Sequence, residues 1–386
     1  MIPRCCEKNI KKLSGLFPAI FIIGPRQSGK TTLCRQYIKG EYYDLERPSD
    51  IQVFEGDIEL ALENTPKPVV IDEAQQLPEL FNVLRSLIDE NRKKNGQYYL
   101  LGSVNPLLLK SISESLAGRV GIVELTPFFY KEVRNKRKLD ELWRKGGYPD
   151  SLLTRTNEDS FLWRENYIST FIERDMIRHG VDISPRQIRI FLGMLSNIHG
   201  NILNSSEIGK SMGISYHTVN KYLDILEGYS LVRRLYPYHA NIKKRLVKSP
   251  KFYFRDSGIL HSLLQLKDHR NLMESPKRGN SWEGFLIEEI INHQRIVNPH
   301  LNFYYFRTHT GLEADLIIEN SNSKTGIEIK LSASLKPDDY RNLITLKQQK
   351  IIDRGVVLYK GKRTFPIEDN IQAMPAEKYL NDPTAW

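Results

Sequence analysis

A loop able to hold phosphate groups is the clearest chemical feature of this sequence. The pattern G-x-x-x-x-G-K-[ST] is matched at every fixed position by Gly24, Pro25, Arg26, Gln27, Ser28, Gly29, Lys30 and Thr31, and Thr32 follows. In such a loop the glycines let backbone N–H groups turn toward phosphate oxygens, and the next helix points its positive end at them. Lys30 would reach the β- and γ-phosphates, and the Thr31 hydroxyl would ligate magnesium. The loop therefore predicts ATP and Mg²⁺ as ligands, with Gly24 to Thr32 as the binding segment.

An acidic pair supplies the second part of this chemistry. Asp72 and Glu73 directly follow the apolar run 68–71. Asp72 would hold magnesium through water, and Glu73 would polarise the water that attacks the γ-phosphate. A surface acidic pair is the alternative interpretation.

Two polar side chains would complete the nucleotide site. Ser103 is our candidate for sensing the γ-phosphate, with Asn105 as the alternative and an ordinary turn as a third interpretation. Arg119 would stabilise transition-state charge, either in cis or from the neighbouring subunit of a homo-oligomer formed through the ATPase domain. Its alternative is an ion-paired surface arginine.

A second group of charged residues, near the C-terminus, has the pattern D-(x)n-E-x-K. It consists of Asp315, Glu328 and Lys330, and Glu283 lies near the start of a predicted helix over 282–293. Residues two apart on a strand face the same side, so Glu328 and Lys330 would point together. Carboxylates there could hold magnesium while the lysine activates a water for attack on phosphorus. An active nuclease site and an inert fold, with Lys330 merely paired to Glu328, both remain open.

A helix-turn-helix pattern precedes this group. Short helices are predicted over 207–212 and 216–227, with Gly213 in the turn, and two strands of a wing over 231–236 and 251–254. The second helix would present His217, Asn220, Lys221 and Tyr222. Seven Lys or Arg and no acidic residue lie between Arg233 and Lys251, which favours contact with DNA phosphates. The predicted DNA contacts are Lys221, Lys243, Lys244, Arg245 and Lys248, and a protein partner is the alternative.

The elements that must position these residues follow from hydrophobic periodicity. Buried strands are predicted over 19–23, 42–45, 68–71, 98–102 and 121–125, with helices between them, as over 78–93. Alternating strands and helices predict a parallel sheet covered on both faces. Longer helices are expected over 161–179 and 185–199, and strands over 304–307, 313–318 and 326–331.

The predicted architecture is an α/β multidomain chain of three segments. Residues 1–145 form a P-loop NTPase parallel sheet of the AAA type, residues 146–275 a helical and winged-helix domain, and residues 276–386 a restriction-endonuclease-like α/β domain. A chain of 386 residues suits two or three domains.

Composition limits the class of protein. Hydrophobic residues make up 40% and charged residues 26%, which excludes a wholly disordered chain. The formal net charge of +10 fits a polyanion partner. Apolar runs are too short for a membrane helix, and the first residues lack the apolar core of a signal peptide. For the same reason we expect no membrane partner. The three cysteines do not form a disulfide or zinc pattern, and we therefore expect a cytoplasmic protein.

These motifs in this order resemble the prokaryotic AAA-type ATPases that join a P-loop domain to a C-terminal domain of unknown function with a restriction-endonuclease-like, PD-(D/E)XK, segment. The resemblance spans nearly the full length. It is carried by Gly24 to Thr32, Val69 to Gln75, Leu101 to Ser103, Leu116 to Arg119, Glu124 to Phe128, Gly147 to Pro149, Glu173 to Asp175, Lys251 to Gly258, Trp282-Glu283, Glu313 to Asp315 and Glu328 to Lys330. It implies ATP binding. Val104 departs from the small hydroxyl residue that relatives often carry there.

Two functional hypotheses follow. In the first, a DNA-associated ATPase uses its nucleotide state to control a winged helix and a magnesium-dependent nuclease-like domain. In the alternative, the chain is a non-nucleolytic ATP-dependent switch whose winged helix binds a protein partner.

Overall fold

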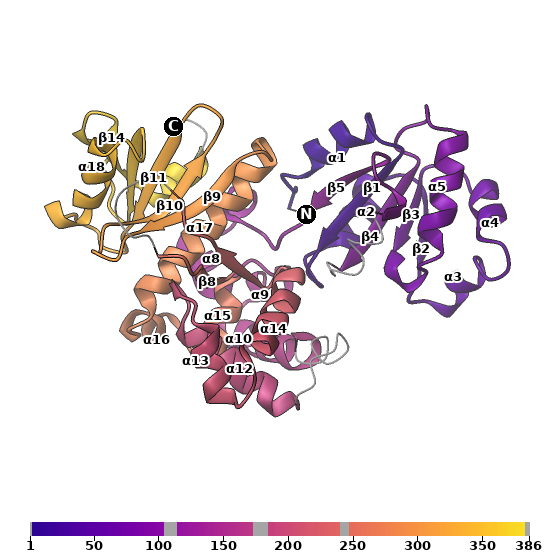
Figure 1. The fold of residues 1–386 in the computed structure, drawn as a ribbon. Helices are drawn as coiled ribbons and strands as arrows, with labels where there is room; N and C mark the ends of the chain where they lie inside the picture. The colour runs from indigo at the N-terminus through magenta and orange to yellow at the C-terminus, as the bar shows by residue number, and fades with distance from the viewer. Residues whose placement is uncertain (1, 104–113, 173–183, 240–246, 383–386) are drawn as a thin grey trace. The chain divides into compact units, whose positions relative to one another are not determined.

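The computed structural model describes residues 2–103, 114–172, 184–239 and 247–382. The chain divides into two compact units (Figure 1). The first unit comprises 1–127 with 228–230, and the second comprises 128–227 and 231–386. Residues 128–145, which the sequence assigns to the ATPase segment, thus belong to the second unit, together with nearly all of both later segments.

The first unit is built on a five-stranded parallel sheet with the order β2-β3-β4-β1-β5. Its elements are α1 (Glu7–Ser14), β1 (Ala19–Gly24), α2 (Lys30–Tyr37), β2 (Glu41–Asp44), α3 (Pro48–Gln52), α4 (Ile58–Asn64), β3 (Val69–Asp72), a 3-10 turn (Ala74–Gln76), α5 (Leu80–Glu90), β4 (Tyr98–Ser103) and β5 (Val120–Glu124). The five predicted strands and their parallel arrangement are confirmed.

Helices cover both faces of this sheet, because consecutive residues of its central strand β1 are apolar and point alternately to the two faces. Phe21 of β1 faces a core that includes Leu84 of α5, whereas Ile20 and Ile22 face a second core with Leu33 of α2. All of β1 is buried, as expected for a central strand of a doubly covered parallel sheet.

The parallel arrangement gathers the predicted nucleotide residues at one edge of the sheet. The phosphate-binding loop follows β1, Asp72 ends β3, and Ser103 ends β4. Gly24 and Ser103 are paired in the ladder. This edge holds the carboxyl ends of the strands, where ligands bind in open α/β sheets.

The second unit begins with a helical layer. Its elements are α7 (Tyr130–Val133), α8 (Leu139–Lys145), α9 (Pro149–Leu152), α10 (Asn157–Tyr167), a π-helical turn (Ile168–Ile172), α12 (Pro185–Asn197), β6 (Asn201–Ile202), α13 (Ser205–Met212), α14 (Tyr216–Gly228), β7 (Val232–Leu235), β8 (Lys251–Phe254), α15 (Ser257–Leu263), α16 (His269–Glu274) and α17 (Arg278–Val297). Trp143 of α8 packs edge-on against Trp282 of α17, with ring centroids 5.0 Å apart. This contact is one reason why residues before 146 belong to the second unit.

A helix-turn-helix lies within this layer. Gly213 ends α13 in the left-handed region (φ 68°), which lets the chain turn directly into α14. A small antiparallel sheet of order β6-β8-β7 accompanies the two helices.

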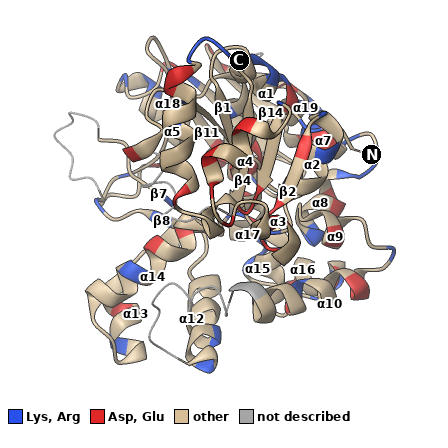
Figure 2. Ribbon diagram, turned by 90° about the vertical axis from the view of Figure 1, so that its right-hand side faces the viewer, with Lys and Arg blue, Asp and Glu red and all other residues tan. Residues whose placement is uncertain are grey.

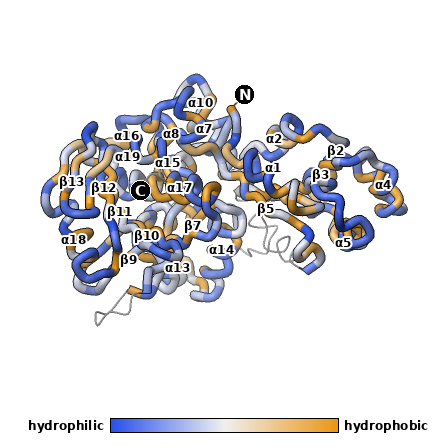
Figure 3. The backbone as a smooth tube through the Cα atoms, turned by 90° about the horizontal axis from the view of Figure 1, so that it is seen from above, coloured by the Kyte–Doolittle hydropathy of each residue, from blue (hydrophilic) through white to orange (hydrophobic). Residues whose placement is uncertain are grey.

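A six-stranded mixed sheet completes the second unit, with the order β13-β14-β12-β11-β10-β9. Its elements are β9 (Asn302–Arg307), β10 (Glu313–Glu319), β11 (Lys324–Ile329), a 3-10 turn (Pro337–Asp339), α18 (Arg341–Gln348), β12 (Arg354–Tyr359), β13 (Phe365–Glu368), β14 (Ile371–Pro375) and α19 (Ala376–Asn381). Strands β11, β12 and β14 run parallel, and the pairs on either side are antiparallel. Helix α17 is buried along much of its length, and its tube carries both hydrophobic and hydrophilic colours (Figure 3).

The connection between β7 and β8 is docked on this sheet. Tyr305 of β9 donates its N–H to the Tyr236 carbonyl at 3.1 Å and accepts from the Tyr238 N–H at 2.7 Å. Val247 donates to the Arg307 carbonyl at 3.1 Å. Both ends of the predicted wing loop therefore lie along the edge strand β9.

Candidate functional site

The two fixed glycines of the phosphate-binding loop each have a geometric reason. A Cβ at Gly24 would lie 2.2 Å from the Leu125 carbonyl oxygen. Gly29 precedes α2 with φ 95°, a left-handed conformation that side chains disfavour. The strand-loop-helix context predicted for this motif is confirmed.

The loop lysine is buried inside this turn. Lys30 Nζ donates to the Gly24 and Pro25 carbonyls, each at 3.0 Å. Burial lowers the pKa of Lys30, and Glu73 and Asp72 oppose this by favouring the charged form. The Ser28 Oγ is buried and has no hydrogen-bond partner among the described residues. A buried ammonium and an unpaired hydroxyl in one loop suit the oxygens of a phosphate group.

The predicted magnesium ligands lie in direct contact. Thr31 Oγ1 donates to Asp72 Oδ2 at 2.6 Å, and the Glu73 N–H donates to Asp72 Oδ1 at 2.9 Å. Tyr42, on β2, also donates its hydroxyl to Asp72. A hydroxyl beside a carboxylate at the end of a buried strand is the oxygen donor set that magnesium accepts.

Glu73 stands next to this pair in an unusual backbone conformation. Its φ is 53°, and it accepts a hydrogen bond from the Gln75 side chain. Burial raises the pKa of Glu73, while Lys30 and the Gln75 hydrogen bond lower it in part. A half-buried carboxylate with a raised pKa suits a residue that accepts a proton from water.

Sequence reasoning missed two residues of this site. Arg4 is buried and donates to the Ser28 carbonyl at 2.9 Å and to the Thr126 carbonyl at 2.5 Å, so it ties the loop to the end of β5. The sequence places Tyr42 on a strand but gives it no role. Its position on β2, beside β3 in the sheet, could have identified it only once the strand order was known.

The remaining nucleotide-site predictions have mixed outcomes. Ser103 lies at the correct edge of the sheet by its backbone position, and Asn105 lies outside the described residues. Arg119 immediately precedes β5, and β5 begins opposite Ala19, at the far end of β1 from the loop. Arg119 is bound there by Asp89, with both hydrogen bonds at 2.7 Å. This position and pairing weigh against a cis role for Arg119. Its role, in cis or in a neighbouring subunit, stays a prediction.

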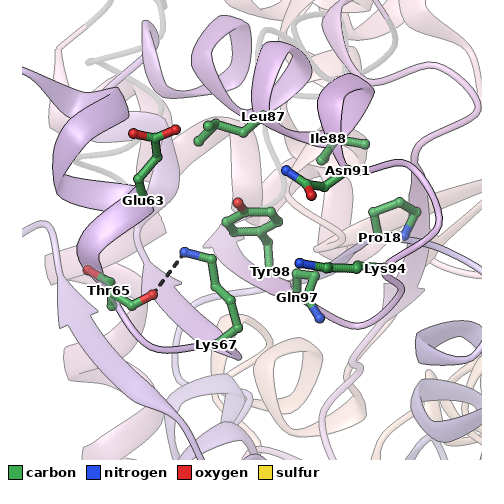
Figure 4. Close-up of a pocket in the computed structure, with 10 residues that line it drawn as sticks. All are labelled: Pro18, Glu63, Thr65, Lys67, Leu87, Ile88, Asn91, Lys94, Gln97 and Tyr98. Atoms are coloured by element: carbon green, nitrogen blue, oxygen red, sulfur yellow. Dashed lines mark hydrogen bonds between the residues drawn. The ribbon is translucent and has the colours of Figure 1, made fainter.

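A pocket of about 300 Å³ also lies at that far end of the sheet. Tyr98, the first residue of β4, and Lys67, two residues before β3, line it (Figure 4). Because the phosphate-binding loop leaves the opposite ends of the strands, this pocket is separate from the nucleotide site.

The C-terminal carboxylates do come together. Asp315 on β10 accepts a hydrogen bond from the Ile329 N–H of β11 at 2.8 Å, and Lys330 Nζ contacts Glu328 Oε1 at 2.8 Å. The predicted pairing of Lys330 with Glu328 is confirmed. The other oxygen of Glu328, Oε2, is buried and has no hydrogen-bond partner among the described residues.

An unexpected cation lies among these carboxylates. Lys251, the first residue of β8, has its Nζ 2.7 Å from Glu313 Oε1, 3.1 Å from Glu283 Oε1 and 3.6 Å from Asp315 Oδ1. The Tyr253 hydroxyl donates to the same oxygen of Glu283 at 2.6 Å. We refer to Lys251, Glu283, Glu313, Asp315 and Glu328 as the carboxylate–lysine cluster.

Electrostatics within the cluster favour a charged lysine. Burial would lower the pKa of Lys251, but Glu283, Tyr253, Asp315 and Glu313 together raise it well above its ordinary value. Burial raises the pKa of Asp315, and the neighbouring Glu328 and Glu283 raise it further. Burial likewise raises the pKa of Glu328, to about 7, although Lys330 lowers it in part.

The predicted metal site at Glu283, Asp315 and Glu328 stays a prediction, and this geometry weighs against it. Within the described ranges, no group of three or more His, Cys, Asp or Glu side chains is arranged to hold a metal ion. The physical reason is the Lys251 ammonium, which contacts Glu283 and Asp315 where a metal would need their oxygens.

The basic hairpin is also different from the prediction. Arg233 is paired with Glu288, and Arg234 with Glu227 and Asp224, while Lys251 is buried in the cluster. These three charges are neutralised within the fold. Lys221 and Lys248 are exposed, and Lys243, Lys244 and Arg245 lie outside the described residues.

The second helix of the helix-turn-helix presents fewer residues than predicted. Tyr216 and His217 are exposed, but Tyr222 is buried and packs edge-on against Phe191. Asn220 accepts a hydrogen bond from Ser205. Acidic and basic positions are interspersed along α13 and α14 (Figure 2), so neither helix is uniformly basic.

Two other predictions concern residues 173–175 and membrane-spanning helices. Glu173, Arg174 and Asp175, part of the family resemblance, lie outside the described residues. No helix within the described ranges has both the length and the apolar character needed to cross a bilayer.

Family models match three successive parts of the chain. An AAA domain model matches residues 16–134, a domain of unknown function (DUF8612) matches 136–270, and a second domain of unknown function (DUF4143) matches 278–379. The match to the AAA domain covers the parallel sheet and the phosphate-binding loop.

Relatives are found in bacteria and archaea. An uncharacterised protein of Mycobacterium tuberculosis is 39% identical over 366 residues, which covers 94% of this chain and 81% of that protein. An uncharacterised protein of Haemophilus influenzae is 23% identical and covers 62% of this chain and 67% of its own length. Among solved structures, a Walker-type ATPase of Pyrococcus abyssi has a TM-score of 0.47 and 17% identity, covering 67% of this chain and 94% of its own.

Proposed function

Since the chain belongs to the same family as the mycobacterial protein and carries an AAA domain, we propose that it is a magnesium-dependent ATPase that acts as a nucleotide-controlled switch. The observation that carries this proposal is the contact of Thr31 with Asp72 beside the buried Lys30. The loop would hold the phosphates, and the first unit would be the catalytic part of the molecule.

Each residue of the site would have its own role in ATP hydrolysis. Lys30 would bind the terminal phosphates, and Thr31 with Asp72 would hold magnesium, which supplies positive charge to offset that of the phosphates. Glu73 would orient the attacking water and accept its proton. Arg4 would keep the loop in shape through its bonds to the Ser28 and Thr126 carbonyls.

The test of this proposal uses the variant Glu73→Gln. We expect it to bind ATP with nearly unchanged affinity, because Lys30, Thr31 and Asp72 are retained. Hydrolysis should fall by about 10², within the range expected when a general base is removed. Steady-state phosphate release and titration with a fluorescent ATP analogue measure the two effects. Hydrolysis at the wild-type rate would remove Glu73 from the mechanism.

The finer part of the proposal concerns the second unit. The helix-turn-helix with its small antiparallel sheet supports a winged helix, and the mixed sheet with Asp315, Glu328 and Lys330 supports a restriction-endonuclease-like domain. The contact of Lys251 with Glu283 and Glu313 favours a non-nucleolytic switch over a nuclease. The pairing of Arg233 and Arg234 within the fold removes these two arginines from the predicted phosphate-contacting surface. DNA contact then rests on Lys221 and Lys248, with Lys243, Lys244 and Arg245.

Neutralising Lys243, Lys244 and Arg245 tests whether DNA is the partner. The variant Lys243→Gln/Lys244→Gln/Arg245→Gln should weaken duplex binding and lower the salt dependence by up to about 0.9 for each phosphate that the protein no longer neutralises. Fluorescence anisotropy over a series of salt concentrations gives the slope. Arg234→Gln is the matched control, because its guanidinium is held by Glu227 and should not reach a phosphate. If wild type binds no DNA, the partner of the winged helix is a protein.

A further inference from the structure

The carboxylate–lysine cluster conflicts with what its pattern implies. A D-(x)n-E-x-K arrangement on neighbouring strands implies a divalent metal held by Asp315 and Glu328. In this chain the carboxylates instead contact a lysine ammonium, at 2.7 Å for Glu313 and 3.1 Å for Glu283. The side chain of Lys251 is only 3% exposed, so this ammonium depends on protein oxygens rather than water.

The backbone holds Lys251 in this position from both sides. Strand β8 is the middle strand of the small sheet, and Lys251 pairs with Ile202 on one side and with Leu235 on the other. Its Nζ also lies 5.8 Å from the centre of the Tyr305 ring, within the range of cation–π attraction. Withdrawing the ammonium would require the strand to leave its partners, or the side chain to leave a buried site.

The cations of the cluster nearly balance its carboxylates without a metal. Even with all four carboxylates ionised, those of Glu283, Glu313, Asp315 and Glu328, three cations face them. The cations are Lys251, Arg307, which lies 3.5 Å from Glu313 Oε2, and Lys330. A divalent ion would add two charges beside a buried ammonium, and the resulting repulsion opposes its binding.

We infer that Lys251 is the resident cation of this cluster, and that the cluster is a metal-independent ion-pair joint that fastens strand β8 to helix α17 and strand β10. It links the helix-turn-helix segment to the mixed sheet within the second unit. The joint takes the position of a divalent-metal nuclease centre, so the second unit does not cleave nucleic acid. Glu328, whose Oε2 is buried without a partner among the described residues, is the group that a metal would bind if Lys251 were removed.

The first experiment titrates Mn²⁺ into nucleotide-free full-length protein by calorimetry. Wild type and Asp315→Asn should give the same heats, because no metal binds at Asp315. Lys251→Met, which keeps most of the length of the side chain and removes its charge, should gain Mn²⁺ binding. The double variant Lys251→Met/Asp315→Asn should lose that gain. Asp315-dependent Mn²⁺ binding by wild type would overturn the inference, and so would a folded Lys251→Met variant that binds none.

The second experiment measures thermal unfolding of the same proteins. Lys251→Met should lower the Tm by at least about 5 °C, because it leaves buried carboxylates unpaired. Mn²⁺ should restore part of this loss in Lys251→Met but not in the double variant, and should leave wild type unchanged. If Lys251→Met does not fold, the comparison of Mn²⁺ binding by wild type and by Asp315→Asn still tests the inference. A DNA cut by wild type with Mn²⁺ that disappears in Asp315→Asn contradicts the inference.

Discussion

Lys30→Ala is expected to reduce ATP hydrolysis by about 10³ and to weaken ATP binding strongly. Removing one positive group that stabilises developing charge in a buried site costs about 10² to 10³ in rate, and Lys30 also contributes to ground-state binding. Two other cations of this region have their own partners: Arg26 is directed to Glu46 at 3.7 Å, and Arg4 donates to the Ser28 and Thr126 carbonyls. Phosphate release and ATP titration measure the two losses.

Lys67→Ala is the matched control for this prediction. Lys67 also donates to two backbone carbonyls, those of Leu62 and Thr65, but it lies at the opposite end of the sheet. We expect its ATPase rate to stay within about twofold of wild type, since it does not reach the phosphates. Equal losses in both variants would mean that Lys30 acts through the stability of the unit rather than on the nucleotide.

The sequence predicts which residues gather at the candidate nucleotide site because most of them are close together in the chain. The glycines, Lys30 and Thr31 lie in one short segment of the chain, from Gly24 to Thr31. Asp72 ends a strand whose burial is predicted by its apolar run. Parallel strands then bring these residues to one edge. Arg4 could not be predicted in this way, because its bond to the Thr126 carbonyl spans 122 residues of sequence.

The second unit shows where residue patterns mislead. A run of basic residues without acidic neighbours suggests a surface for polyanions, yet Arg233 and Lys251 are paired with Glu288 and Glu313, which lie far along the chain. Tertiary contacts also place the Lys251 ammonium among the carboxylates of the D-(x)n-E-x-K region. Sequence spacing places residues on strands, whereas the partner of each charge depends on how the elements pack.

The ion pair of Arg233 with the buried Glu288 shows how such a tertiary contact stabilises a charge inside the fold. Glu288, on α17, is almost fully buried and accepts from Arg233 of β7 and from Arg255 Nε, the latter at 3.1 Å. Burial would raise the pKa of Glu288, but the two guanidinium groups outweigh it and lower the pKa below its ordinary value. The carboxylate thus binds two arginines from the small-sheet segment to the central helix of the second unit.

Glu288→Ala is therefore expected to destabilise the protein by about 3–5 kcal/mol, the cost of leaving buried charges unpaired. Urea unfolding followed by circular dichroism measures it. The control is Glu274→Ala, which breaks an exposed pair with Arg270 and should cost less than about 1 kcal/mol. Equal effects of the two variants would show that Glu288 contributes no more than a surface ion pair.

The pH dependence gives an independent check on the same carboxylate. Because its folded pKa lies below the ordinary value of 4.5, the stabilisation by Glu288 is complete above that pH and is lost as the pH falls through the folded pKa. The difference in unfolding free energy between wild type and Glu288→Ala should therefore be constant near neutral pH and shrink in acid. A difference that persists after Glu288 is protonated would mean that packing around α17, rather than the charge on Glu288, holds the two segments together.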